Sequence, residues 1–361
     1  MIAEHISPDD PRWTQFLSKA PHDVYHLPEY VALEARYEEG EGNPIAFYAE
    51  DSQGSFLAPM ITRPVPEFVK VVVGVTDWQD AISPYGYSPP LSTLSGASLD
   101  VRPFLQAFCE LAASQEIVAV LFRLHPLLGV PPELLAGYGQ LVQHGQTVSV
   151  DLTLPDEEQW RQTRENHRRG IKKLTRAGFS AEMDRWDLFD DFVTIYWETM
   201  SRLEADKRYL FEREYFDDLR TALGSGLHLC TIASPEGDVA GAGLFTVVDG
   251  IVQYHLGATS SEYLRDSPTK LMFDHVRRWA AEAGNRVLHL GGGVGGRTDS
   301  LFHFKAGFSP RRHDFYTFRM VLDESKYAEL NRLWRDQHGE PELEPDEDDS
   351  YFPLYRRPVR G

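Results

Sequence analysis

Cysteine is almost absent from this chain of 361 residues, which contains only Cys109 and Cys230. Two cysteines exclude a disulfide framework and a cysteine-based zinc site, and they fit a reducing compartment. Long hydrophobic runs are also absent, because stretches such as 117–122 fall well short of the roughly 20 residues that span a bilayer. The first residues lack the basic and apolar regions of a secretory signal, so we expect a cytoplasmic protein.

Positive charge is scarce as well. The chain has 36 basic and 55 acidic residues and a formal net charge of −19, which argues against nonspecific nucleic-acid binding, and no DNA partner is expected. The imbalance is uneven, since residues 1–150 hold 7 basic and 18 acidic side chains and residues 340–350 hold seven acids and no base. The remaining middle of the chain is nearly neutral and can carry a local basic surface.

The length and a hydrophobic content of 42% predict two globular α/β lobes. We expect lobes at 1–146 and 147–335, followed by an acidic tail at 336–361. Hydrophobic spacing and turn signals predict helices at 11–18, 27–36, 101–113, 155–177, 188–203, 214–223 and 268–283. The same signals predict strands at 44–49, 56–62, 117–124, 147–152, 227–233, 239–248, 251–258, 286–290 and 315–321. The first lobe thus repeats, less regularly, the element order of the second.

Glycine is concentrated in the segment 291–296, Gly-Gly-Gly-Val-Gly-Gly, directly after a predicted strand. This segment formally satisfies G-x-G-x-x-G, but only a short helix fits after it, so a dinucleotide-binding fold is not expected. Two interpretations stay open. The glycines allow a tight turn, or they let a substrate approach the backbone, in which case Gly292, Gly293 and the nearby Arg297 are candidate substrate contacts.

Seven cations gather between residues 161 and 176, with Glu165 as the only acid among them. On one continuous helix Arg161, Arg164, Arg168 and Lys172 would share a face, because they are spaced by 3, 4 and 4 residues. This face indicates either contact with a phosphate-bearing partner, with Arg168 and Lys172 as binding residues, or a solvated helix favoured by its own dipole. The sequence leaves both readings open.

Other side chains suit the stabilisation of negative charge. Lys305 stands between aromatic residues shortly after the glycine-rich segment, and the segment 206–211 with Tyr215 mixes cations and phenols, including Arg208 and Tyr209. The alternative is a lysine exposed at the surface and a loop that only caps helices. The thirteen histidines form no ligand-spaced cluster, and no G-x-S-x-G or H-E-x-x-H occurs, so neither a metal enzyme nor a serine hydrolase is expected.

Taken together, these segments resemble the Fem-type branch (FemABX-like) of the GNAT acyltransferases. The order strand, helices, three strands, helix, strand is similar to the GNAT fold. The segments that carry the Fem-type resemblance are 25–30 (YHLPEY), 83–87 (SPYGY), 164–173 (RENHRRGIKK), the aromatic positions between 196 and 216, and 291–308. The resemblance implies two GNAT-like lobes, the first one degenerate, each a mixed and mostly antiparallel sheet flanked by helices.

The resemblance also implies a reaction. Fem-type enzymes move an amino acid from aminoacyl-tRNA to an amine of a peptidoglycan precursor that carries a diphosphate, and they need no cofactor beyond this co-substrate. Lys305 matches the family's lysine near the reacting carbonyl, Phe304 is its aromatic neighbour, and Tyr85 belongs to a segment expected to bind substrate. We expect Asp299, Tyr254, His255 and His303 to be candidates for relaying the proton of the amine, and Tyr254 and His255 are also candidate substrate contacts.

Two alternatives remain at this point. An acyl-CoA-dependent N-acetyltransferase acting on an amino sugar, amino acid or peptide amine would need a glycine-bearing loop at the start of the helix near 268. The stretch 263–270 has no glycine, and Pro268 removes one N–H donor, although Lys270 could still reach a phosphate. A non-catalytic binding protein is the second alternative. The expected partners include a membrane-bound precursor contacted peripherally, and the chain is expected to be a monomer or a homodimer.

Overall fold

The computed structural model describes residues 1–38, 42–69, 77–94, 96, 100–206, 209–339 and 351–358. The chain divides into two units, of which the first comprises residues 1–143 and 316–361 and the second residues 144–315. The predicted boundary at 335 differs from this division, because the strand that continues past residue 315 pairs within the first unit and the helix after it packs there. The acidic segment 340–350 lies outside the described residues.

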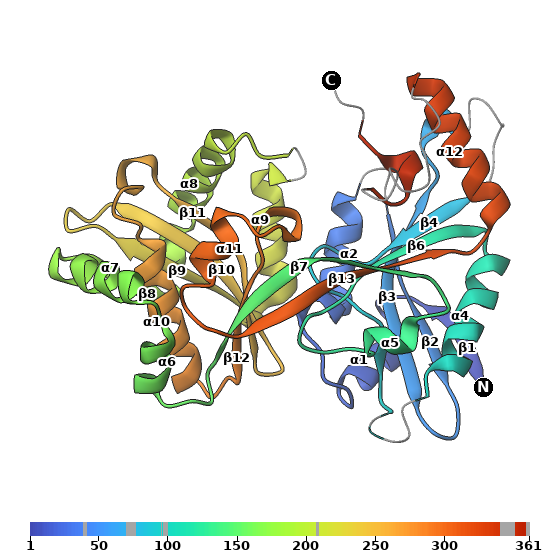
Figure 1. Cartoon of the computed structure of the whole chain (residues 1–361), viewed down its shortest axis with the longest axis horizontal. Coiled ribbons are helices and arrows are strands. Elements are labelled where there is room, and N and C mark those ends of the chain that lie inside the picture. Colours follow the sequence, from blue (N-terminus) through green and yellow to red (C-terminus); the bar gives the residue numbers. More distant parts are fainter. Residues whose placement is uncertain are drawn as a thin grey trace. The chain divides into compact units, whose positions relative to one another are not determined.

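A mixed sheet with the strand order β1-β2-β3-β4-β6-β13 forms the centre of the first unit, and β5 pairs with β3 (Figure 1). Only β4 and β6 pair in parallel among these strands. The strands are β1 (Ile2–Ile6), β2 (Asn43–Glu50), β3 (Ser55–Pro64), β4 (Gln79–Ile82), β5 (Leu91–Ser92), β6 (Ile117–Arg123) and β13 (Arg312–Val321). The helices are α1 (Pro11–Leu17), α2 (Pro28–Tyr37), α4 (Arg102–Ser114), α5 (Pro132–Leu135) and α12 (Glu324–His338).

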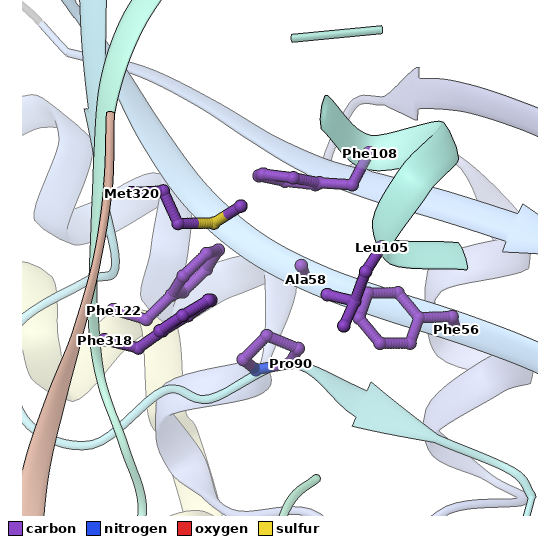
Figure 2. A pocket seen from close by; sticks show the side chains of 8 residues that line it. All are labelled: Phe56, Ala58, Pro90, Leu105, Phe108, Phe122, Phe318 and Met320. Carbon is purple, nitrogen blue, oxygen red and sulfur yellow. The ribbon is translucent and has the colours of Figure 1, made fainter. Parts of the chain in front are cut away.

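Helix α4 covers one face of this sheet and buries Phe104, Leu105 and Phe108 against it. Only a narrow gap, too small to hold a water molecule, remains between helix and sheet (Figure 2). It is lined by Phe56, Ala58, Pro90, Leu105, Phe108, Phe122, Phe318 and Met320. Because this lining has no titratable or polar side chain, the space is a feature of core packing and offers no acid, base or nucleophile.

The strands of the second unit are hydrogen-bonded in the order β7-β12-β11-β10-β9-β8. Only β11 and β12 pair in parallel among these strands. The strands are β7 (Gln140–Asp151), β8 (Ser180–Met183), β9 (Leu227–Ala233), β10 (Val239–Val248), β11 (Ile251–Thr259) and β12 (Val287–Gly291). The helices are α6 (Asp156–Gln162), α7 (Glu165–Arg176), α8 (Phe189–Arg202), α9 (Arg213–Leu223), α10 (Thr269–Glu282) and α11 (Ser300–Lys305).

The core of the second unit lies between this sheet and the helices α7 and α10. Alternate residues of the strands, such as Val148, Val252 and Leu288, face Leu174 and Val276 of these helices. Helix α8 contacts β10 and β11 as well, but its buried side chains are not part of this cluster. The strands predicted at 147–152, 251–258 and 286–290 thus contribute buried residues to this core.

The two units repeat one topology. The series β2-β3-β4-α4-β6 of the first unit corresponds to β9-β10-β11-α10-β12 of the second, and a helix joins the parallel pair in both. In each case the last strand of the series is flanked by an antiparallel partner, β13 beside β6 and β7 beside β12. The predicted fold class, two lobes each with a mixed and mostly antiparallel sheet flanked by helices, is confirmed.

The helix predicted at 155–177 is wrong as a single element. It consists of α6 and α7, with Thr163 and Arg164 in extended conformation between them. Contacts with a distant segment cause the break, since the Arg164 N–H donates to the Gly307 carbonyl at 2.7 Å and the Thr163 hydroxyl to that of Phe308 at 3.3 Å. The spacing predicted one continuous helix face shared by Arg161, Arg168 and Lys172. This is wrong, because Arg161 lies on α6 and the other two lie on α7.

Candidate active site

The site begins where the parallel ladder between β11 and β12 ends. These strands pair only from Ile251 to Gln253 on β11 and from Val287 to His289 on β12. On the other side of β11 the register with β10 shifts at this level, leaving His255 as an extra residue between two pairs. Burial lowers the pKa of His255 to about 4, so this imidazole is neutral at physiological pH. The β11–β12 ladder therefore ends at the height at which the β10–β11 register is interrupted.

A glycine-rich turn follows β12. Gly291 has a φ of +75°, a conformation that favours glycine. At Gly293 a side chain would place its Cβ 2.1 Å from the Arg297 carbonyl oxygen and 2.3 Å from Asp299 Oδ1, so no larger residue fits without moving the turn. The predicted reason for these glycines, a tight turn in which backbone groups approach closely, accounts for Gly293 directly.

Asp299 holds this turn to the start of α11. Its two carboxylate oxygens accept the N–H of Phe302 at 2.8 Å and the N–H of Val294 at 2.9 Å, and it is the N-cap of the helix. These backbone hydrogen bonds keep the pKa of Asp299 below its ordinary value despite partial burial. A carboxylate with a lowered pKa and both oxygens engaged is a weak base, so the structure places Asp299 as a residue that positions the turn.

Lys305 lies at the other end of α11 and points back to the turn. Its side chain is buried, its Nζ donates to the Gly292 carbonyl oxygen at 2.8 Å, and the same atom lies 5.5 Å from the centre of the Tyr254 ring. No carboxylate lies within ion-pair distance of this amine in the described part of the chain. Burial lowers the pKa of Lys305 to about 8, and the negative charge of Asp299 partly opposes this decrease.

This arrangement can perform two kinds of chemistry. Below about pH 8 the buried ammonium can stabilise negative charge that develops on a carbonyl oxygen or on a leaving oxygen, because few water molecules compete for it. Above that pH the neutral amine could accept a proton. Burial raises the pKa of the neighbouring Tyr254 well above its ordinary value, so the phenol remains neutral and can donate a hydrogen bond but not act as a base.

Phe304, which the resemblance implies to be the aromatic neighbour of Lys305, contributes to the core. Its ring lies 5.2 Å from the ring of His167 and 5.6 Å from that of Phe308. Its carbonyl oxygen is 2.9 Å from His167 Nε2. Burial, together with the charges of Lys270 and Arg164, lowers the pKa of His167, which fits a neutral imidazole that donates to this carbonyl.

His167 is a residue that the sequence analysis did not single out. It is buried on α7 and connects this helix to the segment that carries Lys305. A side chain at Gly307 would come within 2.4 Å of His167 Nε2, so the absence of a side chain there makes room for the imidazole. The only local signal was a histidine on the apolar side of a basic helix, next to Ile171 and Leu174 in the helical pattern.

The other predicted binding residues are spread over the two units. Tyr254, His255, Gly292, Gly293 and Arg297 lie around the end of the β11–β12 ladder or in the turn after it. Arg168 and Lys172 lie on α7, and Tyr215 is buried in α9 with its ring stacked 3.9 Å from that of Phe211. Tyr209 accepts a hydrogen bond from the Tyr196 hydroxyl through its carbonyl oxygen, Tyr85 lies in the first unit, and Arg208 lies outside the described residues.

Among the described residues, no group of three or more His, Cys, Asp or Glu side chains is arranged to hold a metal ion. No helix in the described ranges combines the length and the apolar character that crossing a membrane requires.

Comparison with known proteins identifies a matching family over part of the second unit. Residues 161–305 match a family described as an acetyltransferase (GNAT) domain, and this range ends at Lys305. No curated protein matches the chain by sequence. The crystal structure of FemX is similar over 91% of this chain and 99% of its own, with a TM-score of 0.67 and 14% identity.

Two further solved structures are similar at 14% identity. L-PGS from Bacillus licheniformis matches over 87% of this chain and 93% of its own with a TM-score of 0.53. The C-terminal domain of a putative lysylphosphatidylglycerol synthetase from Agrobacterium fabrum matches over 88% and 92% with a TM-score of 0.54. At such identities these likenesses show the fold, whereas the family match indicates the chemistry. The second unit contains a GNAT acetyltransferase domain, and the chain is an acyltransferase with a Fem-like, two-lobed GNAT fold.

Proposed function

We propose that this acyltransferase moves an aminoacyl group from aminoacyl-tRNA to an amine of a phosphate-bearing acceptor such as a peptidoglycan precursor. The observation that carries the proposal is Lys305, a buried amine that has no carboxylate partner among the described residues. A backbone carbonyl holds it where the β11–β12 ladder ends. An activated ester needs little acid–base assistance, so positioning and charge stabilisation at such an amine are sufficient for transfer. The fold shared with FemX and with a lysylphosphatidylglycerol synthetase domain supports the same class of reaction.

The start of α10 favours tRNA over acyl-CoA as the donor. The N–H groups of Lys270 and Leu271 donate within the turn, to Ser267 and Pro268 at 3.0 and 2.9 Å, and Pro268 has no N–H. Asp266 adds a carboxylate there, 3.3 Å from Lys173 Nζ. A pyrophosphate at this helix start would therefore meet few available donors and a negative charge.

The cations of α7 support a donor that carries several phosphates. Arg168, Lys172 and Arg176 have no acidic partner within ion-pair distance in the part of the chain that the structure describes. Glu165, the acid at the start of the helix, lies 3.8 Å from Arg169. In a chain with a net charge of −19, this helix leaves unneutralised positive charge that phosphates of an RNA can occupy.

The mechanism follows from these positions. The neutral amine of the acceptor attacks the ester carbonyl, a C–N bond forms, and the bond between the carbonyl carbon and the ribose oxygen breaks. The ammonium of Lys305 stabilises the negative charge first on the carbonyl oxygen and then on the ribose oxygen. The attacking nitrogen loses one proton and the ribose oxygen takes up one, so no net proton is gained or lost. The net reaction forms an amide and a free ribose hydroxyl.

The test incubates the full chain with a mixed pool of radiolabelled aminoacyl-tRNAs and soluble peptidoglycan precursors. We expect a labelled amide product that is lost when the charged tRNA is treated with RNase beforehand. Lys305→Met should lower the rate at least about a hundredfold, the scale for removing a charge-stabilising donor. Lys19→Ala, which removes an exposed lysine of the first unit, should leave it unchanged.

Three results would contradict parts of the proposal. Transfer from acetyl-CoA to the same acceptors, insensitive to RNase, would replace the tRNA donor by CoA. An unchanged rate in Lys305→Met would remove Lys305 from the reaction. No turnover with either donor would favour a binding protein.

A further inference from the structure

Lys305 has the surroundings of a nucleophile as well as those of a charge-stabilising group. Its Nζ donates to a neutral acceptor, the Gly292 carbonyl oxygen at 2.8 Å, and no carboxylate lies within ion-pair distance of it in the described part of the chain. A lysine beside a carboxylate is held as an ammonium, which has no free electron pair. Lys305 can instead lose its proton without breaking an ion pair, and burial already lowers its pKa to about 8.

The other lysines of the chain lack this combination. The sequence contains eight lysines, and the structure describes five besides Lys305, namely Lys19, Lys172, Lys173, Lys270 and Lys326. Lys173 and Lys326 lie beside carboxylates, whereas Lys19 and Lys172 are exposed. Water and carboxylates both favour the ammonium. Among these six lysines only Lys305 is buried, and it is buried without an acid.

The turn that holds the amine is thin and faces solvent. Five of its six residues from 291 to 296 are glycines, and Val294 and Gly295 are exposed. A Cβ built on Gly295 would meet no atom within 4 Å, so the outer side of the turn borders open space. On this side Lys305 is therefore screened by a backbone almost without side chains, which hinders a small reagent least.

The charges around the turn favour a reagent that is anionic. Arg297 is exposed in the turn, and the Arg164 guanidinium donates to the His303 carbonyl at 3.4 Å. Asp299 is the only acid between positions 283 and 313, and backbone N–H groups occupy both of its oxygens. An acyl phosphate combines an activated carbonyl with a negative charge that such cations attract. It is also small, and unlike acyl-CoA it carries no pyrophosphate that would need the N–H donors of a helix start.

We infer that Lys305 is a covalent modification site for acyl phosphates and that acylation of its amine switches the enzyme off. The neutral Nζ attacks the carbonyl carbon, an amide C–N bond forms, and the bond between that carbon and the phosphate oxygen breaks. The electron pair of this bond leaves with the phosphate, which takes up the proton that the amine releases. Only the loss of activity rests on the proposed function, because an amide has no charge with which to stabilise an oxyanion.

The experiment treats the full chain with acetyl phosphate at pH 7.5, without tRNA or acceptor, and follows acetylation of each lysine by peptide mass spectrometry. We expect Lys305 to be acetylated about tenfold faster than Lys19, the exposed reference in the same chain. At this pH about a quarter of Lys305 is neutral, against about one in a thousand for an ordinary lysine, and burial and lower basicity offset part of this advantage. In urea that unfolds the chain, the two lysines should react alike.

The pH dependence separates Lys305 from its neighbours. Asp299 in the turn and Tyr254 on β11 are the titratable groups beside the amine in the described part of the chain. The pKa of Asp299 is lowered and that of Tyr254 is raised, so neither changes charge between pH 7 and 10. The acetylation rate of Lys305 should therefore level off above about pH 8, whereas that of Lys19 should keep rising to pH 10.

Lys305→Arg is the control variant, because it keeps a cation and has no primary amine; its other lysines should be acetylated as in the unchanged chain. The inference is overturned if Lys305 reacts no faster than Lys19, if its preference persists in urea, or if its rate keeps rising to pH 10. It is also overturned if chains acetylated at Lys305 keep transferring while Lys305→Met does not. Acetylation needs no transfer, so its failure leaves the proposed function standing, and a chain inactive with every donor still shows whether Lys305 is the modified residue.

Discussion

Replacing Lys305 by methionine should make the protein more stable while it abolishes transfer. Methionine has a similar length and no charge, so it fills the same buried space without an amine that has to be desolvated. Most substitutions of buried residues destabilise a protein. An increase in the free energy of unfolding would therefore indicate that burial of the Lys305 ammonium destabilises the native state.

The magnitude follows from the pKa. Lys305 titrates at about 8 instead of 10.5. At about 1.4 kcal/mol for each pH unit, burial of the charged amine costs the native state about 3 kcal/mol at neutral pH. Loss of the hydrogen bond to the Gly292 carbonyl offsets about 1 kcal/mol of the expected gain. We therefore expect the free energy of unfolding of Lys305→Met to exceed that of the wild type by about 2 kcal/mol at pH 7.

The pH dependence carries a definite sign. Below about pH 8 Lys305 is protonated in both the native and the unfolded state, so the wild type bears the full cost of burial. Between about pH 8 and 10.5 the unfolded state binds the proton more tightly, and wild-type stability rises with pH. The difference between Lys305→Met and the wild type should therefore be largest at pH 7 and shrink as the pH approaches 10.

Urea unfolding followed by circular dichroism at pH 7, 8.5 and 9.5 measures this difference. Lys19→Ala serves as the control for the loss of a lysine that is exposed. The reasoning is refuted if Lys305→Met is less stable than the wild type by more than about 1 kcal/mol at pH 7, with a difference that does not change with pH. That result would mean that the amine contributes to stability as an ordinary hydrogen-bonded residue.

Three further predictions follow from the same geometry. Asp299→Asn keeps an oxygen for capping but removes the charge that raises the pKa of Lys305. In a pH–rate profile, the wild-type kcat/KM is expected to fall near pH 8, and in this variant the fall should occur at lower pH. Gly293→Ala places a Cβ 2.1 Å from the Arg297 carbonyl oxygen and should lower kcat at least tenfold, whereas Gly226→Ala, whose Cβ would meet only the Val247 carbonyl oxygen at 3.5 Å, should not. Arg168→Ala combined with Lys172→Ala should weaken tRNA binding and lower the slope of log affinity against log salt by about 1 to 2 in filter-binding measurements, and an unchanged slope would show that these cations do not contact phosphates.

Regular elements with strong local signals were predictable from the sequence. The bounds predicted for β9 and β10 agree with the structure, because each is a mostly apolar run that stands between clear turn signals. The Asp249-Gly250 hairpin also formed as expected, with both residues at positive φ. Short strands such as β4 and β8, with four residues each, were missed because they have too few residues to show a period.

The break between α6 and α7 could not be predicted, because its cause lies far away in the sequence. Local propensity and charge favour a continuous helix from 155 to 177, whereas the hydrogen bonds of Thr163 and Arg164 to residues 307 and 308 pull two residues out of it. The position of α12 in the first unit has the same kind of origin. Its apolar residues Leu330, Leu333 and Trp334 pack with Val118, more than two hundred positions earlier.

Part of the candidate site was accessible from sequence. The sequence motif predicts Lys305 as a site residue. Its hydrogen-bond acceptor, the Gly292 carbonyl, could not be predicted, because its position depends on a turn with several positive φ angles and hydrophobic periodicity does not predict the path of such a turn. Asp299 was interpreted as a proton relay although a local rule already indicated its observed place, since Asp directly before a short helix is a preferred N-cap. His167 became visible only when the fold placed it against Phe304 and Phe308.

The charge distribution of the chain gives these local observations a common reason. A buried amine keeps a pKa near 8 only if few carboxylates approach it, because each one would stabilise the ammonium and also compete with an anionic substrate for it. A chain with a net charge of −19 offers many carboxylates, yet a single one lies between residues 283 and 313, and backbone N–H groups occupy its two oxygens. This scarcity of acids leaves the ammonium of Lys305 available to a developing oxyanion, while Asp299, the single acid, is engaged in holding the turn.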